Sequence, residues 1–154
     1  MIWGIIIVLI VALDQFTKYV IVNKIVFGEV IPVLDKFFYL TYWENKGAAW
    51  GILQNGRYFF IVLTSIVIVI MAYFLYKADN NYLKVSLALV LGGALGNLVD
   101  RVRMGSVVDF LDFYIGSYHF PTFNVADTFV VIGTFLLAYY LIFIYKEKEL
   151  ESIQ

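Results

Sequence analysis

Two aspartates, Asp109 and Asp127, are the residues of this sequence best suited to chemistry. Two carboxylates that lie close together in a partly dry site cannot both ionise cheaply, so such a pair shares one proton. One carboxylate can then accept a proton from water, while the other donates to the carbonyl that the water attacks. The pair therefore indicates aspartyl protease chemistry, provided that the fold brings the two residues together.

The composition argues against several other chemistries. The 154 residues include no cysteine and a single histidine, His119. We therefore expect no disulfide, no thiolate catalysis, no conventional zinc cluster, and neither a metal nor a cofactor. The formal net charge of -1 gives no reason to expect nucleic acid as a partner.

The chain has the composition of a membrane protein, because 62% of its residues are hydrophobic and only 15% are charged. Its length suits one integral membrane domain, residues 1–154. Crossing the hydrocarbon layer takes about 20 helical residues. The segments that meet this requirement are predicted at about 2–22, 58–76, 83–99 and 125–145. Gly92 and Gly96 in the third segment form a small-xxx-small pair that lets a neighbouring helix approach closely.

The connections between these helices differ in length. The connection at 77–82 is a short polar turn, whereas 23–57 and 100–124 are long enough to fold. Segments 29–42 and 107–114 are rich in residues that favour strands. With four crossings, both long connections lie on the same side of the membrane. We therefore predict that they pair into one small sheet that caps this face.

This topology brings the unusual polar residues together near one membrane interface. Asp109 follows the third helix, and Asp127 lies in the first turn of the fourth. The other polar residues placed at the same interface are Asp14, Lys18, Asn45, Asn97, Asp100 and Arg101. Charged groups in membrane segments are expensive, so each needs either a structural partner or a function.

Structural interpretations also exist for most of these residues. Asp14 and Lys18 can form an ion pair one turn apart in one helix, and Asp100 with Arg101 can form a charge cluster at a helix end. Asn97 can form a hydrogen bond to a neighbouring helix. The other structural alternatives are a capping box of Asn124 with Asp127, a polar strand face for Asp109 and Asp112, and an interfacial loop position for His119.

Five sequence blocks occur in the order and at the spacing of a known family. They are LDQFTK (13–18), NKGAAWGIL (45–53), GGALGNLVDR (92–101), VVDF (107–110) and FNVAD (123–127). On these blocks the chain resembles lipoprotein signal peptidase, the bacterial signal peptidase II family, along nearly its whole length. Departures are small: Thr128 stands where the family often has serine, and Lys46 occupies a variable position.

The resemblance implies a fold and a set of site residues. The fold has four transmembrane helices, a small extracytoplasmic β-sheet or cradle formed within 23–57 and 100–124, and a short interfacial helix. The catalytic pair carries over to Asp109 and Asp127. Residues that support the site or bind substrate carry over to Asp14, Lys18, Asn45, Gly47, Asn97, Asp100, Arg101 and Asn124. Segment 47–49 would suit a flexible lid.

The resemblance also implies a substrate, partners and a location. The enzyme would be an aspartic endopeptidase that cleaves diacylglyceryl-modified prolipoproteins on the amino side of the lipidated cysteine. Membrane lipids and cyclic peptide inhibitors of the globomycin type would be further partners. It would lie in the bacterial cytoplasmic membrane with both termini inside and the active site near the extracytoplasmic face. Basic residues are fewer beside the short connection than beside the long ones, which taken alone favours the opposite orientation.

Two other classes of function compete with this interpretation. A small proton- or ion-coupled transporter also needs aspartate and lysine inside the membrane. It predicts carboxylates spread across the depth of the bilayer, whereas here they cluster toward one side. A purely structural membrane subunit leaves this cluster without a purpose.

Overall fold

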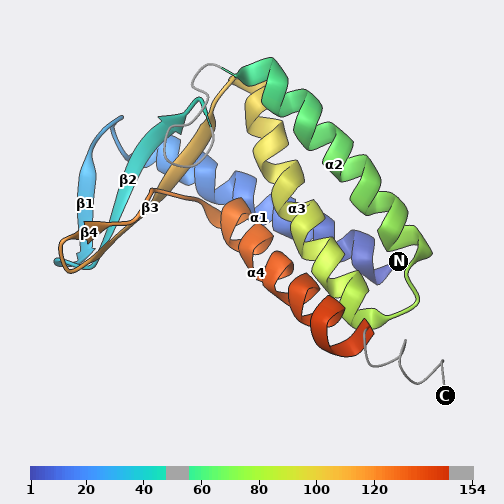
Figure 1. Ribbon diagram of the computed structural model, residues 1–154. Helices are drawn as coiled ribbons and strands as arrows, with labels where there is room; N and C mark the ends of the chain where they lie inside the picture. Colours follow the sequence, from blue (N-terminus) through green and yellow to red (C-terminus); the bar gives the residue numbers. More distant parts are fainter. Residues whose placement is uncertain (48–55, 146–154) are drawn as a thin grey trace.

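The computed structural model describes residues 1–47 and 56–145, in which the chain forms four long helices and one small sheet (Figure 1). Each of the four helical segments is long and apolar enough to cross a membrane. Helix α4 continues as a π-helix over Tyr140–Tyr145. The helices are α1 (Ile2–Lys24), α2 (Arg57–Lys77), α3 (Asn81–Arg103) and α4 (Val125–Tyr139).

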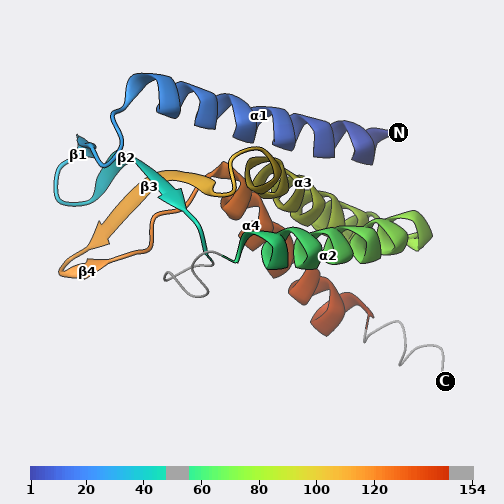
Figure 2. The same cartoon turned by 90° about the horizontal axis from the view of Figure 1, so that it is seen from above.

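Helix α3 lies at the centre of the bundle and contacts α1, α2 and α4 (Figures 1 and 2). Its glycines permit this close packing. A Cβ atom added at Gly92 would lie 2.8 Å from the side chain of Ile10, and one added at Gly96 would lie 2.6 Å from a carboxylate oxygen of Asp14. The predicted close approach at this small-residue pair is confirmed, and the neighbouring helix is α1.

The two ends of the bundle differ. The N-terminus and the short connection between α2 and α3 lie at one end, and the sheet lies at the other (Figure 1). The strands are β1 (Val30–Leu34), β2 (Phe38–Asn45), β3 (Val107–Ile115) and β4 (Tyr118–His119). They pair antiparallel in the order β1-β2-β3-β4, so β2 of the first long connection joins β3 of the second. This confirms the predicted sheet.

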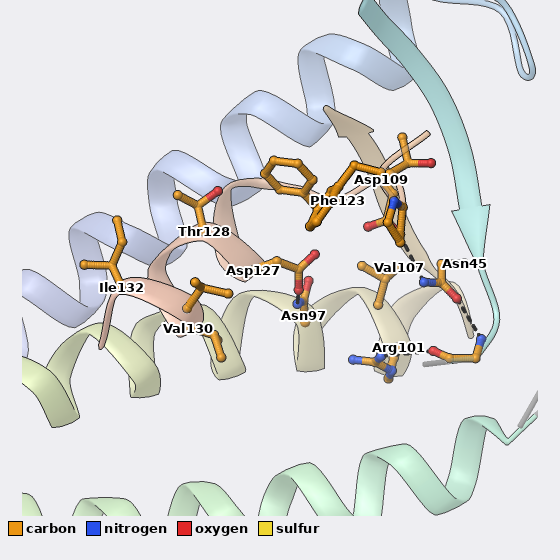
Figure 3. A pocket seen from close by; sticks show the side chains of 15 residues that line it. Asn45, Asn97, Arg101, Val107, Asp109, Phe123, Asp127, Thr128, Val130 and Ile132 are labelled. Carbon is orange, nitrogen blue, oxygen red and sulfur yellow. Dashed lines mark hydrogen bonds between the residues drawn. The ribbon is translucent and has the colours of Figure 1, made fainter. Parts of the chain in front are cut away.

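The strand β3 rests on the end of α1. Val108 and Phe110 are buried against Ile21 and Ile25 and form a small hydrophobic core. Because successive side chains of a strand point to opposite faces, Asp109 between them faces away from this core. The packing of β3 therefore directs the Asp109 carboxylate toward the start of α4, as Figure 3 shows.

Several predicted boundaries need correction. The third helix was expected over 83–99 but extends over Asn81–Arg103. Asp100 does not end it, because its buried carboxylate forms an ion pair with Lys18. Helices α1 and α2 also run slightly beyond 2–22 and 58–76. The fourth segment, expected as one helix, changes to π-helical geometry at Tyr140.

One smaller element differs from expectation, because His119 lies in the short strand β4 rather than in a loop. The short interfacial helix has no counterpart in the described parts of the two long connections and stays a prediction. Residues 48–55, which include Ala48 and Ala49 of the predicted lid, lie outside the described residues.

Candidate active site

Asp109 and Asp127 line the same cavity, although they come from different elements (Figure 3). Asp109 is the third residue of β3, and Asp127 occupies the first turn of α4. The structure therefore brings together the two carboxylates that the sequence singles out. Asp109 is only 3% exposed, so its carboxylate lies in the partly dry environment that shared protonation requires.

Asn124 joins the two aspartates through one amide side chain. Its Nδ2 donates to Oδ1 of Asp109 at 2.7 Å, and its Oδ1 accepts from the backbone N–H of Asp127 at 2.9 Å. The Asp127 carboxylate accepts in return from the backbone N–H of Asn124 at 3.2 Å, which completes a capping box. The predicted capping role is confirmed, and the same residue also fixes Asp109 relative to Asp127.

Two further asparagines, Asn45 and Asn97, each donate a hydrogen bond to one of the two carboxylates. Asn45 Nδ2 donates to Oδ2 of Asp109 at 3.1 Å, while Asn45 Oδ1 accepts from the backbone N–H of Gly47 at 2.9 Å. Asn97 Nδ2 donates to Oδ1 of Asp127 at 2.7 Å. The predicted interhelical role of Asn97 is therefore confirmed. Each carboxylate thus accepts hydrogen bonds at both of its oxygens.

The environment of Asp109 favours its protonated form. Burial raises the pKa of Asp109 from 3.8 to about 7, and the negative charge of Asp127 adds to this increase. The hydrogen bonds from Asn45 and Asn124 and the positive charge of Lys18 oppose it. At neutral pH the Asp109 carboxyl therefore can hold a proton, which is the property that a general acid needs.

The cavity around the pair has a volume of about 560 Å³ and a largely apolar wall. Its polar groups lie at one end, where Asn45, Asn97 and Arg101 surround the aspartates (Figure 3). The rest of the wall is formed by Gly47, Val107, Phe120, Pro121, Thr122, Phe123, Thr128, Val130, Val131 and Ile132. This shape suits a long apolar ligand whose one polar bond must reach the carboxylates.

Asp14, Lys18 and Asp100 form a second polar cluster that does not line this cavity. The intrahelical ion pair of Asp14 with Lys18 is confirmed at 2.9 Å. Asp100 and Arg101 both lie near the end of α3, as expected of a charge cluster at a helix end, and the ion-pair partner of the Asp100 carboxylate is Lys18 at 2.7 Å. Helix packing buries the Asp100 carboxylate against α1 and leaves Arg101 on the cavity side.

Arg101 and Gly47 lie at the rim of the cavity. The Arg101 guanidinium lies over the ring of Phe60, with 5.2 Å between its Cζ and the ring centroid. Its Nη2 donates to the carbonyl of Gly47 at 3.4 Å. Arg101 thus links α3 to α2 and to the chain that follows β2.

The sequence interpretation missed Gln15. Its Nε2 donates to Oδ1 of Asp100 at 2.8 Å and to the carbonyl of Gly96 at 3.2 Å. Its position beside Asp14 in the first sequence block was the available signal. Asp112, the other acidic residue of β3, contacts His119 at 2.5 Å and does not line the cavity.

Comparison with known proteins identifies the family. The model of the family described as signal peptidase (SPase) II matches residues 6–143. The chain belongs to the signal peptidase II family. Lipoprotein signal peptidase of Bacillus pumilus is 49% identical over 82% of this chain and 83% of that protein. Lipoprotein signal peptidase of Caldanaerobacter subterraneus subsp. tengcongensis is 49% identical over 90% of this chain and 94% of that protein.

Solved structures share the fold of this chain. A bacterial membrane enzyme solved by the in meso method at 2.3 Å resolution aligns with a TM-score of 0.85 and 40% identity, covering 91% of this chain and 87% of that one. A second, at 1.9 Å resolution, aligns with a TM-score of 0.83 and 39% identity, covering 92% and 93%. The chain is thus a peptidase with the fold of these membrane enzymes, as the sequence blocks predicted.

Proposed function

We propose that this peptidase removes the signal peptide from diacylglyceryl-modified prolipoproteins, cleaving on the amino side of the lipidated cysteine. Membership of the signal peptidase II family supports the substrate class. The observation that carries the mechanism is that Asn124 holds Asp109 and Asp127 in one apolar cavity. We assign catalysis to these two carboxylates and a water molecule, without a metal or cofactor.

In this mechanism Asp127 is the general base and Asp109 is the general acid. Asp127 lies at the N-terminus of α4, where the helix dipole favours a negative charge. Asp109 holds the shared proton because burial raises its pKa to about 7. Asp127 takes a proton from water as the water oxygen bonds to the scissile carbonyl carbon, and Asp109 gives its proton to the carbonyl oxygen.

The second half of the reaction returns both protons. The tetrahedral intermediate collapses when its C–N bond breaks, and the proton held by Asp127 passes to the leaving amine. A hydroxyl proton of the intermediate returns to Asp109 as the new carboxyl group forms. The dyad is then ready for another water molecule, and no covalent enzyme intermediate forms.

The apolar part of the cavity accounts for a lipidated substrate. Val130 and Ile132 extend the wall along α4 away from the carboxylates (Figure 3), and Val131 also lines the cavity. Acyl chains and the apolar signal helix would lie against this wall, with the scissile bond at the polar end. Membrane lipids and cyclic peptides of the globomycin type would occupy the same space. We place the sheet end of the bundle at the extracytoplasmic face of the bacterial cytoplasmic membrane.

Substitution of each aspartate tests this function. Asp109→Asn and Asp127→Asn should each lower the cleavage rate of a diacylglyceryl-prolipoprotein by at least about 10²–10⁴-fold, the usual contribution of general acid–base catalysis. Asp112→Asn is the matched control, because Asp112 is also buried in β3 but does not line the cavity. It should retain cleavage.

The variants must be compared as folded proteins purified in detergent and reconstituted in lipid. Substantial cleavage by Asp109→Asn or Asp127→Asn would remove that residue from the mechanism. The transporter alternative predicts a different pair of results. Proteoliposomes of the wild-type protein would then conduct protons or ions without cleaving the substrate, and both variants would lose this flux.

A further inference from the structure

The backbone just before each aspartate is held by a buried carboxylate from another part of the chain. The N–H of Ala126, which precedes Asp127, donates to Oδ1 of Asp14 at 2.9 Å. The N–H of Val108, which precedes Asp109, donates to Oδ2 of Asp100 at 3.3 Å. The start of α4 and the start of β3 are thus each anchored one residue away from a catalytic side chain.

A single cation joins these two anchors. Lys18 Nζ lies 2.9 Å from Oδ2 of Asp14 and 2.7 Å from Oδ2 of Asp100. It also donates to Oδ1 of Asn97 at 2.9 Å. An ammonium group has three donors, and these three acceptors use all of them.

Lys18 is also connected to Asp127 through the side chain of Asn97. Because Oδ1 of Asn97 accepts from Lys18, its Nδ2 is turned toward Asp127, to which it donates at 2.7 Å. Lys18 therefore acts on Asp127 by two routes, through the Asp14 anchor and through the Asn97 amide. It acts on Asp109 through the Asp100 anchor.

We propose that Lys18 is the positioning residue of the active site, because its ammonium sets the separation of Asp109 and Asp127 through the Asp14, Asp100 and Asn97 side chains. This inference rests on the proposed function of the two aspartates. Lys18 does not line the substrate cavity, so it acts through other residues and touches no substrate.

Burial makes this arrangement specific. Asp14 is fully buried, Asp100 is 2% exposed and Lys18 is 3% exposed. Removing the cation leaves two carboxylates buried without their shared partner, and their anchors then lose a defined position. Arginine keeps the charge, but its planar fork does not match three acceptors arranged around an ammonium.

Other charged groups face this cluster from each element around it. Asp127 of α4 lies on the far side of Asn97, and Asp109 of β3 follows Val108 in the chain. Arg103 of α3 lines a small cavity together with Lys18. The charge of Lys18 lowers the pKa of Asp109, against the larger effects of burial and Asp127. Loss of the cation should therefore change the pH dependence of catalysis as well as its rate.

The first test replaces Lys18 by methionine or arginine. Lys18→Met should lower kcat by about 10²-fold, the size of effect expected when reacting groups are misplaced by about 1 Å, with little change in KM. The pH above which the Lys18→Met variant loses activity should be higher than in the wild type, because the pKa of Asp109 rises further without the charge of Lys18. Lys18→Arg should lower kcat but leave this pH limit unchanged.

A merely structural role predicts a different result. The substitution would then only reduce the fraction of folded enzyme. Activity would fall by the same factor at every pH, and the pH limits of activity would stay unchanged. Wild-type kcat or an unshifted profile in folded Lys18→Met would overturn the proposal. If Asp109→Asn and Asp127→Asn are inactive while folded Lys18→Met is fully active, only the role of Lys18 fails.

The second test leaves Lys18 in place and moves one of its anchors. A Cβ atom at residue 96 would lie 2.6 Å from Oδ2 of Asp14, whereas the three atoms nearest to one at residue 92 all belong to the side chain of Ile10. Both substitutions crowd the same interface between α1 and α3. Gly96→Ala should lower kcat at least about 10-fold more than Gly92→Ala at equal folded fraction. Equal kcat values for the two variants would contradict the proposal even if Lys18→Met does not fold.

Discussion

Each end of the helix bundle carries an asparagine that caps a helix, and the two caps show how differently the ends are built. Asn80 caps α3 at the short-connection end, where its Oδ1 accepts from the backbone N–H groups of Tyr82 and Leu83. Asn124 caps α4 at the sheet end. It is fully buried, and its amide also donates to Asp109 and Asn97.

The same capping chemistry thus serves two purposes. At the short-connection end the Asn80 side chain accepts from two helix N–H groups. At the sheet end it belongs to a network in which three asparagines and the Lys18 cluster orient two carboxylates. The proposed active site thus lies where the cap is buried and where both polar atoms of its side chain have partners.

Asn124→Ala should have the larger effect of the two cap substitutions. It removes the capping hydrogen bond, which typically stabilises by about 1 kcal/mol, and it frees Asp109 from Asp127. We expect a loss of kcat of about 10²-fold from misplacement of the dyad, together with a lower thermal unfolding temperature in detergent. Near wild-type kcat in a folded Asn124→Ala protein would show that the amide bridge does not organise the dyad.

Asn80→Ala should affect stability alone. The loss is about 1 kcal/mol in the free energy of unfolding, because only a helix cap is removed. Cleavage of the prolipoprotein substrate, measured per folded molecule, should equal that of the wild type. A kcat loss comparable to that of Asn124→Ala would mean that the two ends are coupled, and the comparison drawn between them would then be wrong.

Much of this arrangement could be predicted from local sequence. Long apolar runs predict the spans, because a bilayer requires about 20 helical residues to cross it. The parity of four crossings places both long connections on one side, and β-rich segments within them predict the sheet that β2 and β3 form. The motif blocks then single out Asp109 and Asp127.

The remaining features depend on tertiary contacts. Asp100 looked like the charged end of a helix beside Arg101, but packing against α1 buries it with Lys18 and lets α3 continue to Arg103. Gln15 had no periodic or charge signal of its own, and only its contacts with Asp100 and Gly96 reveal its place. Neighbouring charges in a sequence therefore do not predict which charges pair across helices.

The proposed mechanism requires that Asp109 and Asp127 share one proton, with Asp109 as its holder. The raised pKa of Asp109, about 7 against 3.8 for an ordinary aspartate, means that the folded protein keeps this proton up to neutral pH and loses it as pH rises through about 7. Catalysis by the dyad should decline over the same range, since the general acid is then absent.

Infrared difference spectroscopy of the purified protein in lipid, titrated from pH 5 to about pH 9, tests this claim most directly. We expect a protonated carboxylic acid band that disappears near pH 7 together with cleavage activity and that is missing from Asp109→Asn. The matched control Asp112→Asn should keep the band. A wild-type spectrum without this band at pH 5, or a band that persists in Asp109→Asn, would contradict the assignment of the shared proton to Asp109.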